Sequence, residues 1–287
     1  MRGGSSNNTR IRIYLIGSYL GFRDKIISAL PQYQFSDPRK HRQSCVLKLA
    51  YDDMTEAETC PVALAIFPKN KRKGVMSYAE LGASKVHDNH IIVVDEDKDD
   101  PLLEKIAKQN FNSVDDAIAF LKTNPEFKRN KKKKIIKKYP QTTEHTGIPQ
   151  KNIYICGTID EKILETIDKA KKIRPEKNFI LRSEDTYKDF QRITEYDLIV
   201  AHFPGHLDWD RHAMFMIGAA YPHNIPVLLI EDKDWRYPPL QAIVRRHGRT
   251  MNCLLEYITE VNDAHISREA VNMYAFFERE MKRRKRG

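Results

Sequence analysis

The 287-residue sequence is poor in cysteine and has no long apolar run, and both absences restrict the class of protein. Its four cysteines, at 45, 60, 156 and 253, lie far apart and form no C-x-x-C pair. This spacing argues against a cysteine zinc site and a disulfide framework, and it favours a reducing, intracellular setting. No stretch approaches 18 consecutive apolar residues, so we expect no membrane association. The polar start MRGGSSNNTR lacks the apolar core of a secretory signal and is interpreted as a flexible leader.

The excess of basic charge, +10 overall, is confined to two short segments. Eight of the 49 basic residues lie in 128–138 and five in 282–286, which leaves 36 basic residues against 39 acids in the rest of the chain. The simplest interpretation is a solvated linker and a solvated tail. The alternatives are a nuclear-import signal and a weak, salt-dependent contact with polyanions. We therefore expect a cytoplasmic protein, with a nuclear location left open.

The sequence contains two related halves. RIYLIGS at 12–18 resembles NIYICGT at 152–158, and IIVVDEDKD at 91–99 resembles VLLIEDKD at 227–234. The offset between the halves is 140 residues at the start and 135 at the end, which is hard to obtain by chance. We predict a tandem duplication. Its parts are a first domain at 10–126, a basic linker at 127–150, a second copy at 151–262, and a C-terminal helix with a basic tail at 263–287.

Each half alternates short apolar runs with helical patterns. In the first half, Ile11–Ile16, Val62–Phe67 and Ile91–Val94 are typical of buried parallel strands. Helical patterns cover 23–30, 51–59 and 78–87, and the second half repeats the order at 152–156, 161–173, 186–195, 198–203, 212–221 and 227–230. The alternation predicts an α/β protein with two tandem, doubly wound parallel sheets of the Rossmann or flavodoxin type.

Three elements of the first half are expected to meet at one crevice, because ligands of such sheets bind at the carboxyl ends of the strands. Tyr14 lies near the end of the first strand. Asp52 and Asp53 lie on the helix before the central strand, and Glu80 is expected in the first turn of the helix after it. The bland interpretation of these acids is an ordinary helix-start glutamate and a solvated pair of aspartates.

The order and spacing of these residues resemble the nucleoside 2-deoxyribosyltransferase family and its nucleotide N-glycosidase relatives. The matching features are the opening I-Y-x-x-G-S, an aspartate about eight residues ahead of the central strand, and the helix start GVMSYAELG at 74–82. The resemblance implies that Glu80 attacks the sugar C1′, that Tyr14 orients Glu80, and that Asp53 assists proton transfer or orients the substrate. Asp52 is a less favoured candidate than Asp53 for the second acid, which protonates the leaving base. Such a carboxylate pair suits an oxocarbenium-like transition state.

Four further residues are candidates for substrate binding: Gly17, Ser18, Gly74 and Ser77. Backbone N–H groups in a tight turn at a helix start favour anions, and the basic residues at 71–73 add positive charge. The resemblance implies that a serine before the glutamate marks enzymes of nucleoside monophosphates. Where deoxyribosyltransferases carry an acid that grips the base, this chain has KNKRK at 69–73, which favours a phosphorylated substrate. No metal and no cofactor is predicted.

The second half departs from the pattern at the reactive position. Aligning Gly218 with Gly82 places Met216 where Glu80 lies, and a thioether cannot act as a carboxylate nucleophile. We therefore interpret the second half as a degenerate copy that replaces the neighbouring subunit of a family dimer, giving a pseudo-dimer. The polar residues at 206–212 leave open the alternative that the second half binds a ligand of its own.

The functional hypothesis is cleavage or transfer at the N-glycosidic bond of a small-molecule nucleotide or nucleoside. The alternative is a catalytically decayed nucleotide sensor or scaffold. A third hypothesis is a nucleic-acid-associated protein that acts through the two basic segments.

Overall fold

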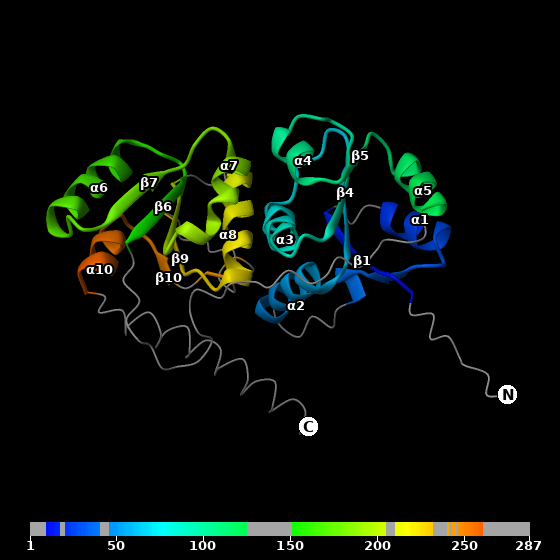
Figure 1. Cartoon of the computed structure of the whole chain (residues 1–287), viewed down its shortest axis with the longest axis horizontal. Coiled ribbons are helices and arrows are strands. Elements are labelled where there is room, and N and C mark those ends of the chain that lie inside the picture. The colour runs from blue at the N-terminus through cyan, green and yellow to red at the C-terminus, as the bar shows by residue number, and fades with distance from the viewer. Residues whose placement is uncertain are drawn as a thin grey trace, which may run out of the picture.

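The structure is a computed structural model in which the chain forms two lobes, side by side (Figure 1). It describes residues 10–17, 21–40, 46–124, 151–204, 210–231, 240, 243–244 and 246–260. The predicted linker, the C-terminal helix, the basic tail and Ser18 lie outside the described residues. Within them, no helix combines the length and apolar character needed to cross a bilayer.

The first lobe is a five-stranded, all-parallel sheet in the order β2-β1-β3-β4-β5. Every residue of the central strand β3 is buried, because helices cover both faces of the sheet. The strands are β1 (Arg12–Gly17), β2 (Gln34–Ser36), β3 (Val62–Phe67), β4 (His90–Asp95) and β5 (Gln109–Phe111). The helices are α1 (Phe22–Ala29), η1 (Pro38–Lys40), α2 (Val46–Thr59), α3 (Val75–Val86), α4 (Pro101–Ile106) and α5 (Val114–Thr123).

The second lobe has the same architecture, and its sheet order is β10-β9-β8-β6-β7. Its strands are β6 (Asn152–Gly157), β7 (Asn178–Leu181), β8 (Leu198–Phe203), β9 (Val227–Glu231) and β10 (Arg246–Gly248). Its helices are α6 (Glu161–Ile173), α7 (Thr186–Gln191), η2 (Ile193–Glu195), α8 (Arg211–His223) and α10 (Asn252–Glu260). Counted within each lobe, both sheets have the flavodoxin-like order 2-1-3-4-5. The structure confirms the predicted fold class of two tandem, doubly wound parallel sheets.

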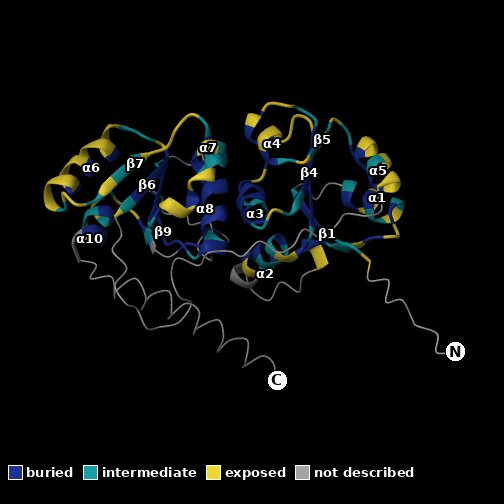
Figure 2. Ribbon diagram, viewed as in Figure 1, coloured by how far each residue is buried: buried dark blue, intermediate teal, exposed yellow. Residues whose placement is uncertain are grey.

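The lobes meet where α3 packs against α8, and buried residues fill this central layer (Figures 1 and 2). A Cβ added at Gly82 of α3 would overlap the Phe215 carbonyl oxygen of α8 and lie 2.7 Å from the Ala219 nitrogen. A Cβ at Gly218 of α8 would overlap the Ala79 carbonyl oxygen of α3. Each helix therefore needs a glycine at the crossing, and the contacts are reciprocal, as in a two-fold symmetric dimer.

One hydrophobic cluster runs through this interface and includes side chains from both sheets and both helices. Two further clusters lie on the outer faces, one in each lobe. Since the α3–α8 layer belongs to a single shared core, the two halves form the predicted pseudo-dimer within one chain.

Polar contacts at one end of the interface fix the position of the α4 N-terminus. Asp100, the N-cap of α4, accepts a hydrogen bond from the Tyr78 hydroxyl at 2.5 Å and lies 3.3 Å from the His212 ring of α8. Burial acts to raise the pKa of Asp100, but the His212 and Tyr78 contacts and the charge of Arg211 outweigh it and hold that pKa at about 2. Arg211 and His212, from the polar segment of the second half, therefore contact the first lobe.

Candidate active site

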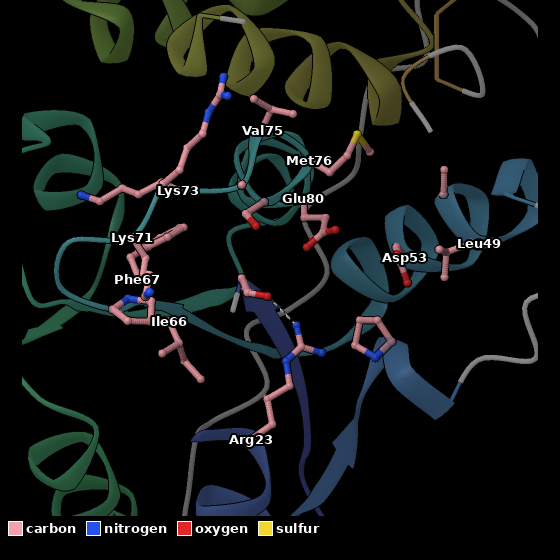
Figure 3. Close-up of a pocket in the computed structure, with 17 residues that line it drawn as sticks. Arg23, Leu49, Asp53, Ile66, Phe67, Lys71, Lys73, Val75, Met76 and Glu80 are labelled. Atoms are coloured by element: carbon pink, nitrogen blue, oxygen red, sulfur yellow. Dashed lines mark hydrogen bonds between the residues drawn. The ribbon is translucent and has the colours of Figure 1, made fainter. Parts of the chain in front are cut away.

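A cavity of about 490 Å³ opens at the carboxyl ends of β1 and β3, where the order of the first sheet reverses (Figure 3). Doubly wound sheets bind their ligands at this position. All the lining residues belong to the first half, so no described residue of the second half closes the cavity. They are Gly17, Arg23, Pro38, Leu49, Ala50, Asp53, Ile66, Phe67, Pro68, Lys71, Arg72, Lys73, Gly74, Val75, Met76, Ser77 and Glu80.

Glu80 lines the cavity from the second turn of α3, and its residue is only 7% exposed. The prediction that Glu80 lies in the first turn of this helix is wrong. The helix begins at Val75, three residues before the expected start, directly after the extended backbone of Gly74. Glu80 is therefore held in the body of the helix, on the face that borders the cavity.

The charge of Glu80 is controlled by its neighbours. Burial raises the pKa of Glu80 well above its ordinary value, and the Asp53 carboxyl raises it further. The Arg23 guanidinium and the Tyr14 hydroxyl act in the opposite direction. Figure 3 shows the Glu80, Asp53 and Arg23 side chains directed toward one another. Two carboxyls beside one arginine can share a proton, which leaves one of them as an acid and the other as an anion.

Tyr14 approaches Glu80 from the sheet. It is fully buried on β1, pairs with Ala63 of β3, and belongs to the hydrophobic cluster between the two sheets. The packing fixes the ring, so its hydroxyl can hold the Glu80 carboxyl in one orientation.

The two aspartates of α2 lie in different surroundings. Asp53 is buried and lines the cavity, whereas Asp52 is half-buried and is not among the lining residues. Adjacent residues of a helix point about 100° apart, so only one of the two can face the cavity. The geometry favours Asp53 as the partner of Glu80.

Arg23 is a site residue that the sequence analysis missed. It is 1% exposed on α1, and its guanidinium donates to Asp37 at 2.8 Å and to the Gly17 carbonyl oxygen at 2.8 Å. Burial acts to raise the pKa of Asp37, but hydrogen bonds from Arg39 and Arg23 outweigh it and lower that pKa. Asp37 is thus a fixed anion that holds Arg23 in place. An arginine three residues before the buried Ile26 on an amphipathic helix was the available signal.

Three of the five predicted substrate-binding residues line the cavity: Gly17, Gly74 and Ser77. Asp52 is not among the lining residues, and Ser18 lies outside the described residues. Gly17 ends β1 with φ 90°, and a Cβ there would collide with the Ile66 carbonyl oxygen. Only glycine fits this turn. Ser77 is buried in the first turn of α3, and Gly74 is exposed as its N-cap.

The basic residues of the 68–74 loop have different roles. Lys73 is buried, donates to Asp95 at 2.6 Å and to Asp99, and lies over the Phe67 ring. Its charge is used to fix the loop to the end of β4. Lys71 and Arg72 are exposed and line the cavity, so these two are available to an anionic ligand.

The corresponding position of the second lobe contains no such carboxylate. Tyr154, the equivalent of Tyr14, donates to Asp189 at 2.8 Å, and Asp189 also accepts from the Ser183 N–H at 2.8 Å. Met216, at the position of Glu80, is fully buried in the shared core. The tyrosine therefore bonds the α7 aspartate instead of a glutamate. Asp210 caps α8, while His206, Asp208 and Trp209 lie outside the described residues.

Within the described part of the chain, no group of three or more His, Cys, Asp or Glu side chains could hold a metal ion. No protein-family model matches the chain, and no curated protein matches it.

Several solved structures have a low similarity to this chain. A ketoreductase domain from the bacillaene assembly line is 9% identical, with 99% of this chain and 80% of that chain covered and a TM-score of 0.26. A D-isomer specific 2-hydroxyacid dehydrogenase from Lactobacillus delbrueckii ssp. bulgaricus is 10% identical over 94% and 97% of the two chains, with a TM-score of 0.22. A two-component system response regulator/GGDEF domain protein is 10% identical over 88% and 98%, with a TM-score of 0.27. At these scores the similarities carry no argument about function.

Proposed function

We propose that the protein cleaves or transfers the N-glycosidic bond of a nucleotide or nucleoside, with Glu80 as the nucleophile. The observation that carries the proposal is the buried Glu80 carboxyl, which lines a cavity together with Asp53 and Arg23 and whose pKa the Tyr14 hydroxyl lowers. A buried carboxylate pair at a ligand-binding position is a candidate for acid–base and nucleophilic work.

In the first step, a Glu80 oxygen forms a bond to C1′ while the bond from C1′ to the base nitrogen breaks. The electron pair leaves with the base, which takes a proton from Asp53. In the second step, water attacks C1′ and returns a proton to Asp53, and Glu80 leaves as a carboxylate. A second base in place of water gives transfer. This is the two-step mechanism of retaining glycosidases, which passes through a covalent glycosyl-enzyme intermediate.

Three neighbours act on the charge and the orientation of Glu80. Arg23 stabilises the ionised form of Glu80, and the Tyr14 hydroxyl orients it. Because the Asp53 charge raises the pKa of Glu80, the attack requires the proton to lie on Asp53 and not on Glu80.

The test is release of free base by the purified protein from a panel of nucleosides, nucleoside monophosphates and NAD, followed by chromatography. We expect release from at least one member, and a loss of at least 100-fold in Glu80→Gln and Glu80→Ala. Asp53→Asn should reduce the rate in the same direction.

The second lobe offers a matched control. Asp189→Asn alters the aspartate that Tyr154 bonds, in the lobe that lacks the nucleophile, so the rate should stay at the wild-type level. Release that survives Glu80→Gln would contradict the proposal. Thermal stabilisation by a nucleotide without base release from any member would instead support a nucleotide sensor.

A further inference from the structure

A second cavity, of about 520 Å³, adjoins the active-site cavity. Its lining residues are Gly21, Phe22, Lys25, Pro68, Lys69, Lys71 and Glu96. Pro68 and Lys71 line both cavities, so this loop is their common border. The glycosidic chemistry proposed above uses none of the residues that line only the second cavity.

Positive charge dominates this second cavity. Its one carboxylate, Glu96, accepts the Lys69 backbone N–H at 2.9 Å, and Lys25 forms an exposed ion pair with Asp115 at 2.7 Å. Lys69 and Lys71 are exposed, and neither forms an ion pair with a residue that the structure describes. Two ammonium groups are therefore available to an anion that crosses from one cavity to the other.

The backbone that carries these lysines is fixed in place. Besides the Lys69 contact with Glu96, the Asn70 N–H donates to the Asp97 carboxylate at 3.1 Å, with Asn70 in a left-handed conformation. Lys73 anchors the end of the same loop to Asp95. A loop held at both ends loses little freedom when an anion binds, which favours affinity.

Phe22 adds an aromatic side chain to the wall of this cavity. The residue is half-buried, and it packs against the outer hydrophobic cluster of the first lobe. An aromatic ring that is held from behind offers a flat face for a base or another planar group.

We propose that the two cavities together bind one extended substrate, a nucleotide that carries a pyrophosphate. The reactive sugar lies at Glu80, and the phosphate chain crosses Pro68 to reach Lys71 and Lys69. The assignment of the sugar rests on the proposed function. The pyrophosphate can belong to a nucleoside diphosphate or to a dinucleotide, and in a dinucleotide the second nucleoside lies against Phe22.

The experiment uses probes that contain no base, so it does not require the base of the substrate to be known. Inorganic pyrophosphate and inorganic phosphate are titrated into the full-length protein by calorimetry at two salt concentrations. We expect pyrophosphate to bind about tenfold more tightly than phosphate, and the Lys69→Ala/Lys71→Ala variant to lose roughly that factor. Binding should weaken in high salt. The control Lys122→Ala removes an exposed lysine of α5 and should change nothing.

A second series separates the two sources of the pyrophosphate. ADP and NAD are titrated into a Glu80→Gln background, which blocks turnover, with and without Phe22→Leu. A dinucleotide site predicts that Phe22→Leu weakens NAD several-fold and leaves ADP unchanged, whereas a diphosphate site predicts that Phe22→Leu changes the affinity for neither ligand.

The outcomes distinguish this inference from the proposed function. If base release depends on Glu80 but pyrophosphate binds no better than phosphate, or binds equally well without the two lysines, the glycosidic function stands and the extended site is refuted. If the lysines are needed for pyrophosphate but no substrate releases a base, the anion site stands and the reaction is refuted.

Discussion

The substitution Glu80→Gln should stabilise the folded protein, and the gain should grow with pH. The folded state raises the pKa of Glu80 well above its ordinary value near 4.5, because the carboxyl is buried beside Asp53. The folded protein therefore holds this proton more tightly than the unfolded chain does. As pH rises from about 4.5 toward the raised pKa, the wild type loses stability that the neutral amide retains. Above the raised pKa the difference is constant.

The slope of this effect follows from linkage. Within that pH window, the difference in the free energy of unfolding changes by about 1.4 kcal/mol for each pH unit. For a protein of this size, that corresponds to about 3–6 °C in the difference between melting temperatures. Thermal melts of both proteins from pH 5 to pH 9 measure it, with Glu165→Gln, an exposed acid of α6, as a control that should follow the wild type. A difference that is flat across this range, or that falls as pH rises, would refute the account of the Glu80 environment.

Three further predictions concern the site and the interface. Tyr14→Phe removes the hydroxyl that favours the Glu80 carboxylate and should lower kcat/KM about tenfold, whereas Tyr154→Phe in the second lobe should leave the rate unchanged. The pH profile of kcat/KM should rise as Glu80 loses its proton, because only the carboxylate can attack C1′, and any residual rate of Glu80→Gln should lack this rise. Gly82→Ala should destabilise the protein by about 1–3 kcal/mol in urea unfolding, because its Cβ would overlap the Phe215 carbonyl oxygen; no loss of stability would contradict the packing of α3 on α8.

The central strands were predictable from the sequence, and the edges of the sheets were not. The strands β3, which is wholly apolar, and β8, in which His202 is the one polar residue, matched the predicted bounds, because strands covered on both faces are mostly apolar. The edge strands β2 and β5 were missed, since each has three residues that are partly exposed and shows no apolar run. The start of α3 was predicted three residues late, because the helix has no side-chain cap that would mark it.

The candidate site was predictable where reactive side chains lie close to the carboxyl ends of the predicted strands. The meeting of Glu80, Asp53 and Gly17 at one cavity follows from the rule that ligands bind at strand carboxyl ends. Arg23 was missed because a charged residue on a helix is expected in solvent, and only its tertiary partner Asp37 makes burial favourable. The choice between Asp52 and Asp53 likewise required the orientation of α2.

The most direct test of the central claim is peptide mass spectrometry on protein quenched in acid during turnover of a substrate found by the base-release panel. The account predicts the added mass of the sugar on the peptide that contains Glu80, and no such adduct in Glu80→Gln. A sugar attached to any other residue, or base release that continues in Glu80→Gln, would contradict it.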